Sequence, residues 1–488
     1  MINILTLGGG LRVVCERMES VRSVAAGVWV GAGSRYEDAS RAGISHFIEH
    51  MLFKGTRRRT ARQIAEEIDC VGGQINAFTA KDCTCFYTKT LDSSLGVGVD
   101  ILADILLHSK LLKTDIDLER NVILEEINMI EDSPDELVHD LLSEGVWRGC
   151  ALGGPILGTG ETLAHIDANA MRDYLGRRYV PGNTVIAVTG AFDEGALLKA
   201  LEKGFRKWIA GGPAVRAGED AAPTAPEAAR AGGAAARAGG DAARAVDQAV
   251  VACATDRVGA ARAGEPATRA GDLAPTVPEA ARDMYFGGTD DANYSAGVFI
   301  RQKDTEQVHL CIGFDGVELG NDDIYVLQLI NYIFGGGMSS VLFQKIREEL
   351  GLVYSIYSYV TAYRRAGLFA IYAGMQTEQA ARVFDMIIGE MRVFKQSGMT
   401  PDLLNRAKEQ FKGNYLMGLE NPSARMSALG KSELLLGYYK TPEETVAKIE
   451  KVTLDEIYNV MNRIFDPDKL AVSAVGRIDG SLEKALKP

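Results

Sequence analysis

The sequence predicts an α+β fold built from two homologous α/β sandwich domains. The order strand, helix, helix, strand, strand occurs twice along the 488 residues, and a low-complexity tract separates the two copies. A chain of this length is also too long for one ordinary hydrophobic core. We therefore expect a first domain over 1–210, a low-complexity insertion or linker over 211–285 and a second domain over 286–488.

The first copy contains its five elements, in order, at 23–34, 43–53, 60–72, 74–80 and 83–91. An apolar strand comes first, two helical patterns follow, and two alternating runs predict paired strands. The second copy repeats this order at 307–316, 322–337, 339–351, 353–361 and 367–375. Each copy continues with a long helix and a late strand, at 95–111 and 183–192 in the first and at 377–394 and 469–478 in the second.

The first helix of each copy shares an apolar frame. When ISHFIEHMLFKG at 44–55 is laid over YVLQLINYIFGG at 325–336, a phenylalanine and a glycine coincide near the end. The polar positions differ, because the first copy has His46, Glu49 and His50 where the second has Leu327, Ile330 and Asn331. Packing of this helix therefore does not require the polar residues, and only the first copy is expected to bind a metal.

Composition narrows the class of protein. The net charge of −12 and a sequence pI of about 5.2 argue against a nucleic-acid partner. Seven cysteines without a CxxC pair favour a reducing compartment. No apolar run of about 18 residues and no leader-like N-terminus occurs, so we expect a cytoplasmic protein without a membrane span.

The tract over 211–285 is rich in Ala, Gly, Arg and Pro, and APTAPEAARA at 222–231 returns as APTVPEAARD at 274–283. Such a composition buries too little apolar surface to offset the entropy of ordering the chain. We expect a flexible insertion that plays no part in the chemistry.

The pentapeptide HFIEH at 46–50 is the candidate metal-binding motif. Residues four apart project from one face of a helix, so His46 and His50 can present their rings to one ion, and imidazole suits zinc. Glu49 flanks the same face. A pair of histidines at this spacing is more often an ordinary part of a helix surface, and two ligands leave a zinc site one protein ligand short.

A helical pattern over 118–132 offers the missing donor. Glu119 and Glu126 are seven residues apart and share one stripe, whereas Glu125 points about 100° away from Glu126. Taken alone, this segment is better explained as a helix with a solvated acidic face.

HFIEH followed by Glu126 within ERNVILEEI resembles the pitrilysin (M16) family of zinc metallopeptidases, which carry the inverzincin motif HxxEH. GGGMSSVLFQKIREELGLVYS in the second half resembles the signature of that family's second domain. The resemblance is closest to bacterial homologues of the mitochondrial processing peptidase β subunit. It implies a clam-like peptidase of two domains, with one Zn²⁺ per chain.

By that resemblance His46, His50 and Glu126 are zinc ligands, Glu49 is the general base and Glu119 supports the ligands. Asn76, Ala77 and Phe78 lie on the strand that pairs with substrate, and Arg347 and Tyr354 reach the substrate carbonyl. The resemblance implies a zinc endopeptidase acting on peptides or unfolded segments, without nucleic-acid or membrane partners, as a homodimer. The alternative is a non-catalytic scaffold or partner subunit of the same fold; a metal-storage module would require Cys/His clusters that the sequence lacks.

Overall fold

The computed structural model describes residues 2–211 and 292–486, so the expected insertion lies, except for Gly211, outside the described residues. The described chain packs into two compact units. One holds residues 2–123, 156–211 and 418–441, and the other holds 124–155, 292–417 and 442–486. The border between residues 123 and 124 falls inside one continuous helix.

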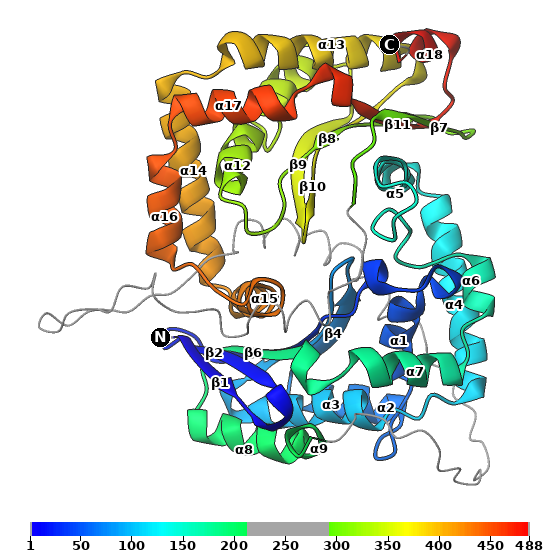
Figure 1. Ribbon diagram of the computed structural model, residues 1–488, viewed down its shortest axis with the longest axis vertical. Coiled ribbons are helices and arrows are strands. Elements are labelled where there is room, and N and C mark those ends of the chain that lie inside the picture. Colours follow the sequence, from blue (N-terminus) through cyan, green and yellow to red (C-terminus); the bar gives the residue numbers. More distant parts are fainter. Residues whose placement is uncertain (1, 212–291, 487–488) are drawn as a thin grey trace, which may run out of the picture. The chain divides into compact units, whose positions relative to one another are not determined.

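The first unit is built on a six-stranded sheet with the order β1-β2-β6-β3-β5-β4. Figure 1 labels β1, β2, β6 and β4 of this sheet. Neighbouring strands are antiparallel except β2 and β6, which are parallel. Among the described strands β4 pairs with β5 alone, so it is an edge strand of the described sheet. The strands are β1 (Ile2–Thr6), β2 (Arg12–Arg17), β3 (Ser23–Val30), β4 (Gln74–Thr79), β5 (Thr84–Leu91) and β6 (Thr184–Gly190).

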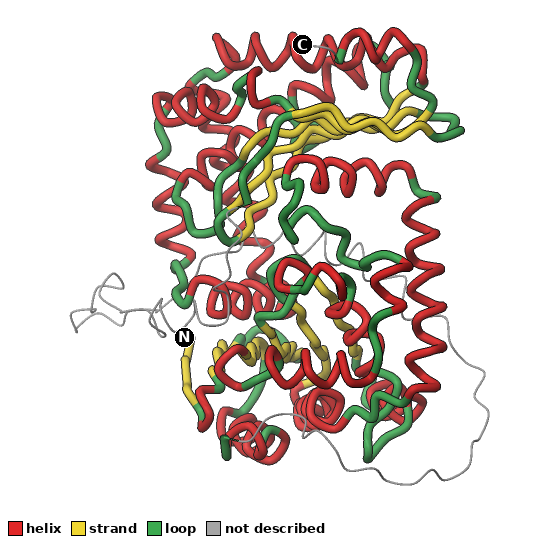
Figure 2. Tube along the Cα trace, turned by 45° about the vertical axis from the view of Figure 1, so that its right-hand side comes forward, coloured by secondary structure: helices red, strands yellow, loops and turns green. Residues whose placement is uncertain are grey.

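The second unit is built on a five-stranded sheet with the order β7-β11-β8-β10-β9. Figure 2 shows these strands side by side, with helices on both faces of the sheet. Only the pair of β11 and β7 is parallel. The strands are β7 (Gly297–Gln302), β8 (Val308–Asp315), β9 (Ser355–Tyr363), β10 (Ala366–Met375) and β11 (Ala471–Gly476).

The helices of the first half follow the predicted order. They are α1 (Ile44–Leu52), α2 (Ala61–Cys70), α3 (Leu95–His108), α4 (Lys113–Glu131), α5 (Pro134–Val146), α6 (Gly160–Ala164), α7 (Ala168–Arg178), α8 (Glu194–Gly204) and α9 (Arg206–Ile209). The start of α2 has a capping box, in which Thr60 and Gln63 each bind the other's backbone N–H.

The second half contains α12 (Asp323–Phe334), α13 (Ala380–Val393), α14 (Pro401–Leu419), α15 (Pro422–Lys431), α16 (Pro442–Lys451), α17 (Leu454–Ile464) and α18 (Gly480–Ala485). Three further segments wind as π-helices, at Phe343–Glu349, Phe394–Gly398 and Ser432–Leu436. No helix in the described parts is both long and apolar enough to span a bilayer.

The predicted α+β duplication is confirmed. Without β1, the two sheets share one strand order: β2, β6, β3, β5 and β4 in the first correspond to β7, β11, β8, β10 and β9 in the second. The helix expected over 339–351 differs in detail, because Phe343–Glu349 has the wider π winding, which is frequent at functional sites.

The compact units differ from the expected division at two segments. Residues 124–155 pack with the second unit and residues 418–441 with the first. In the second unit α5 covers β11, β8 and β7, and the Ser473 hydroxyl donates to the Val138 carbonyl at 2.7 Å. An amphipathic pattern shows that a helix has a face to bury but not which sheet receives it, so the sequence did not reveal this exchange.

In the first unit α15 covers β3 and β6. The indole N–H of Trp29 donates to the sulfur of Met426 at 3.2 Å, and Gly430 lies so close to the same indole that an added Cβ would overlap it. Arg12 of β2 makes a buried ion pair with Glu433 at 3.0 Å. Residues from the far end of the sequence therefore complete the core of the unit that contains α1.

Candidate metal centre

Helix α1 is held by its apolar side and presents polar side chains on the other. Phe47, Ile48, Met51 and Leu52 are at most 1% exposed. Within α1 the histidines and Glu49 are only partly buried, so they lie at the boundary between the core and solvent. The local sequence thus separates the residues that anchor the helix from those that are available for chemistry.

The start of α1 is fixed by a carboxylate that sequence analysis missed. Glu37 accepts the backbone N–H of Gly43 at 2.6 Å and of Ser45 at 2.7 Å, as a capping residue does at a helix N-terminus. Burial raises the pKa of Glu37 to about 7, against the opposing effect of these two hydrogen bonds. Gly43 has φ of 94° and approaches Leu157 closely, which leaves no room for a side chain.

Helix α4 is anchored beside α1 through Arg120. Its guanidinium donates to the carbonyls of Leu163 at 3.1 Å and Ile166 at 2.8 Å, and it lies over the Phe47 ring at 5.7 Å. Ile116 and Ile123 are buried on the same helix. These contacts fix the rotation of α4 and therefore the direction in which its glutamates project.

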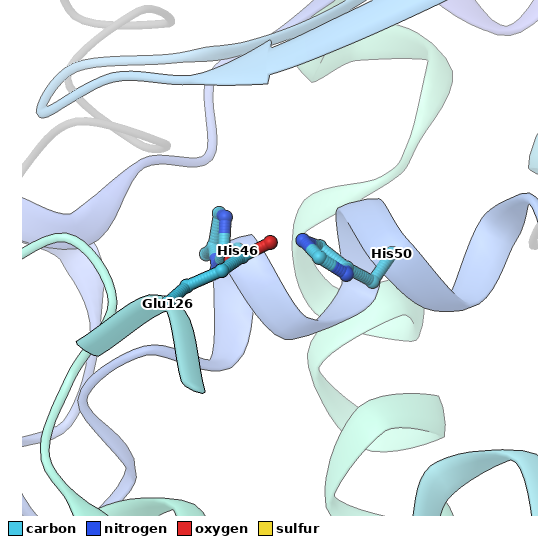
Figure 3. A group of neighbouring side chains, drawn as sticks. All are labelled: His46, His50 and Glu126. Atoms are coloured by element: carbon cyan, nitrogen blue, oxygen red, sulfur yellow. The ribbon is translucent and has the colours of Figure 1, made fainter. Parts of the chain in front are cut away.

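The predicted ligands come together. One ligand atom each from His46, His50 and Glu126 lie within 4.8 Å of one another (Figure 3). In the described part of the chain this is the single group of three or more His, Cys, Asp or Glu residues that fits a metal ion. Glu125 is exposed, as expected for a residue on another side of α4.

The donor set fits zinc. Two imidazoles and one carboxylate are a ligand combination of catalytic zinc sites, which keep one position for water or substrate. Burial, with a smaller effect of His50, lowers the pKa of His46 to about 3, so this ring is neutral at pH 7 and keeps a lone pair for a metal.

Glu119 contacts the site through His50. A carboxylate oxygen of Glu119 lies 3.1 Å from Nδ1 of His50, and the other oxygen is 2.6 Å from the Lys54 ammonium. Burial opposes the charge on Glu119, but the hydrogen bonds to His50 and Lys54 outweigh it and lower the pKa of this carboxyl below its ordinary value. Such carboxylate–histidine contacts orient a ligand ring and raise its basicity.

Lys54→Met should therefore weaken zinc binding by about 10-fold, the lower end of what loss of an outer-shell partner costs, because Lys54 is itself partly exposed. Competition with a chelating dye measures the zinc dissociation constant. Lys113→Met is the matched control, since Lys113 is an exposed lysine whose partner is Asp117. Equal zinc affinity in the two variants would remove Lys54 from the support of the site.

Glu49 is held by the neighbouring edge strand. The hydroxyl of Thr79, at the end of β4, donates to Oε2 of Glu49 at 2.6 Å. Helix α1 packs against β4 within the first unit (Figure 1). The contacts of Thr79 and Lys54 were not predicted, although the alternation of side chains along β4 and the spacing of four from His50 to Lys54 are signals in the sequence.

The residues expected on the substrate strand all lie on β4. The Ala77 N–H donates to the Asn76 side chain at 2.8 Å. The Phe78 ring is buried against Trp29, with ring centroids 5.5 Å apart, so this residue offers a partner strand its backbone rather than its side chain. Pairing with substrate stays a prediction.

Arg347 and Tyr354 belong to the second unit. The Arg347 guanidinium lies over the Phe343 ring at 4.7 Å, one turn earlier in the π-helix. Tyr354 is 56% exposed and accepts a hydrogen bond from Gln376 at 3.3 Å. Their contact with substrate also stays a prediction.

Comparison with known proteins identifies the family of both halves of the chain. Residues 12–160 match the family described as Insulinase (Peptidase family M16), and residues 272–411 match the Peptidase M16 inactive domain. The second description suits a half in which Leu327, Ile330 and Asn331 replace the polar residues of α1.

Relatives with similar sequences match over most of their length. The chain is 36% identical to the uncharacterized zinc protease YmxG of Bacillus subtilis, over 96% of this chain and 97% of that protein. It is 34% identical to the uncharacterized zinc protease SCO5738 of Streptomyces coelicolor, over 93% and 84%. A protease from Helicobacter pylori shares the fold, with a TM-score of 0.76, 18% identity and coverage of 98% and 99%. The chain belongs to peptidase family M16, the insulinase family.

Proposed function

We propose that this protein is a zinc-dependent endopeptidase that hydrolyses peptides or unfolded polypeptide segments. The observation that carries the proposal is the convergence of His46, His50 and Glu126 beside Glu49, whose carboxylate is bound to an edge strand of the described sheet. Relatives with the name zinc protease, matched over nearly their whole length, support it.

Zinc held by His46, His50 and Glu126 would supply a Lewis acid that polarises a carbonyl and lowers the pKa of water. Glu49 takes a proton from the attacking water and delivers it to the leaving amine. Glu119 keeps the His50 ring oriented through Nδ1. Arg347 and Tyr354 are the proposed donors to the oxygen on which negative charge develops.

Substrate is proposed to add as a strand along β4. As an edge strand of the described sheet, β4 can give main-chain hydrogen bonds to an extended peptide of any sequence. Extended peptides should therefore be cut and folded proteins spared, because a folded chain has no free strand to add.

The test is cleavage of a quenched fluorescent peptide by the zinc-loaded protein, with and without a chelator. We expect cleavage that the chelator abolishes and added zinc restores. Stoichiometric zinc binding without cleavage of any member of a mixed peptide library would favour the alternative, a non-catalytic scaffold of the same fold.

A homodimer, a cytoplasmic location and the absence of nucleic-acid or membrane partners complete the proposal. The acidic balance of the chain supports the exclusion of nucleic acid. Sedimentation of the purified chain checks the oligomeric state, with a twofold mass as the expected result.

A further inference from the structure

Thr79 ends the edge strand β4 and is 6% exposed. Its side chain is on the same side of β4 as that of Ala77, because side chains alternate along a strand. From this position its hydroxyl reaches Oε2 of Glu49 on α1, at 2.6 Å. One side chain thus joins the strand proposed to bind substrate to the residue proposed to move the proton.

Proton counting shows which way this hydrogen bond runs. A threonine hydroxyl has one proton to donate. Thr84 lies on β5 and pairs with Thr79 of β4. Its hydroxyl donates to the Ala32 carbonyl at 2.7 Å, and its oxygen is 3.5 Å from the hydroxyl oxygen of Thr79. The contact of Thr79 with Glu49 is shorter than its contact with Thr84, so the Thr79 hydroxyl donates its proton to Glu49. A hydrogen bond to a carboxylate is also stronger than one between two neutral hydroxyls.

We propose that Thr79 is a positioning residue for Glu49, which holds the carboxylate in the orientation for proton transfer. The inference rests on the proposed function. A glutamate side chain has three rotatable bonds, and a hydrogen bond to its carboxylate restricts their rotation. The neighbouring Thr84 differs, since its hydroxyl donates to the backbone carbonyl of Ala32 rather than to Glu49.

A consequence is that loss of the Thr79 hydroxyl should slow turnover without weakening the binding of substrate. Strand addition uses the backbone of β4, which a change in the Thr79 hydroxyl leaves intact. Loss of the hydroxyl therefore affects kcat through the orientation of Glu49 and leaves KM unchanged. A purely structural threonine would instead change thermal stability and both kinetic constants.

Three variants test this. Thr79→Val keeps the shape of the side chain and removes the donor, and we expect kcat to fall about 10- to 100-fold with KM unchanged. Thr79→Ser restores the donor and should recover most of kcat. Thr90→Val is the matched control, because Thr90 is a similarly buried threonine on β5 beyond the end of the β4 pairing.

Zinc content and the unfolding midpoint are measured for every variant, and both should equal the wild-type values. Peptide binding is measured separately in a Glu49→Gln background, in which cleavage is expected to be too slow to deplete the peptide during the measurement. There, fluorescence anisotropy of a labelled peptide should give the same Kd with and without the additional substitution Thr79→Val. Equal kcat in wild type and Thr79→Val, or a failure of Thr79→Ser to recover activity, overturns the inference.

A Kd that worsens as much as kcat/KM falls also overturns it, because Thr79 would then serve binding. A zinc-loaded wild type that cleaves nothing overturns the proposed function, and this inference with it. An active wild type beside an equally active Thr79→Val overturns the inference alone, so the two failures are distinguishable.

Discussion

Glu49→Gln is expected to lower kcat about 100- to 10,000-fold while zinc stays bound. Glutamine keeps the size of the side chain and can still accept the Thr79 hydrogen bond, but its amide cannot take a proton from water. Since Glu49 is not one of the three converging ligands, the metal content should equal that of the wild type. Peptide cleavage and metal analysis on the same preparation measure both.

Glu66→Gln is the control for this loss of charge, because Glu66 is an exposed glutamate on α2 whose partner is Arg62. We expect wild-type kcat from it. Undiminished cleavage by a pure, zinc-loaded Glu49→Gln protein would show that another group takes the proton.

The duplicated fold was predictable because the same order of apolar patterns occurs twice in the sequence. Apolar spacing defines α1 and α12 separately, and their agreement makes each assignment firmer. Since the positions of His46, Glu49 and His50 hold Leu327, Ile330 and Asn331 in α12, chemistry rather than packing explains the polar residues of α1. The two histidines were therefore predictable as a ligand pair, whereas Glu126 was predicted from the resemblance to the M16 family, because its helical pattern alone favoured a solvated face.

Among the residues that contact the cluster or its helices, Glu119 was predicted from the resemblance, but Glu37, Arg120 and Thr79 were not. Glu37 caps α1 from a loop, at a distance in sequence that no helical or strand period encodes. Arg120 acts through backbone carbonyls, which carry no residue identity. The contact of Thr79 with Glu49 depends on which face of β4 meets α1, and a one-residue change in register would reverse that face.

The sequence did not predict which sheets α5 and α15 cover, and the reason is related. Both helices lie far in sequence from the sheets that they cover, and local patterns report burial without naming a partner. Gly430 against Trp29 shows what selects the partner: the absence of a side chain lets the α15 backbone approach one particular indole. Such complementarity is visible only in three dimensions.

Glu126→Gln is expected to weaken zinc binding by more than the roughly 10- to 100-fold that loss of an outer-shell partner costs, because Glu126 is proposed as a direct ligand. Two neutral imidazoles and a carboxylate leave one positive charge on a bound Zn²⁺ site, whereas glutamine in place of Glu126 would leave two. In a partly buried position that additional charge is costly, since less water is available to solvate it.

Glu125→Gln separates this effect from a general loss of negative charge on α4. The two glutamates are adjacent in sequence, but Glu125 is exposed and projects about 100° away around the helix. The zinc affinities are measured by titration of the apo-proteins with zinc in the presence of a buffered chelator. Wild type and Glu125→Gln should bind zinc equally tightly, Lys54→Met more weakly, and Glu126→Gln most weakly. Weaker binding by Glu125→Gln than by Glu126→Gln would mean that α4 presents the other glutamate to the metal, and the ligand set would have to be reassigned.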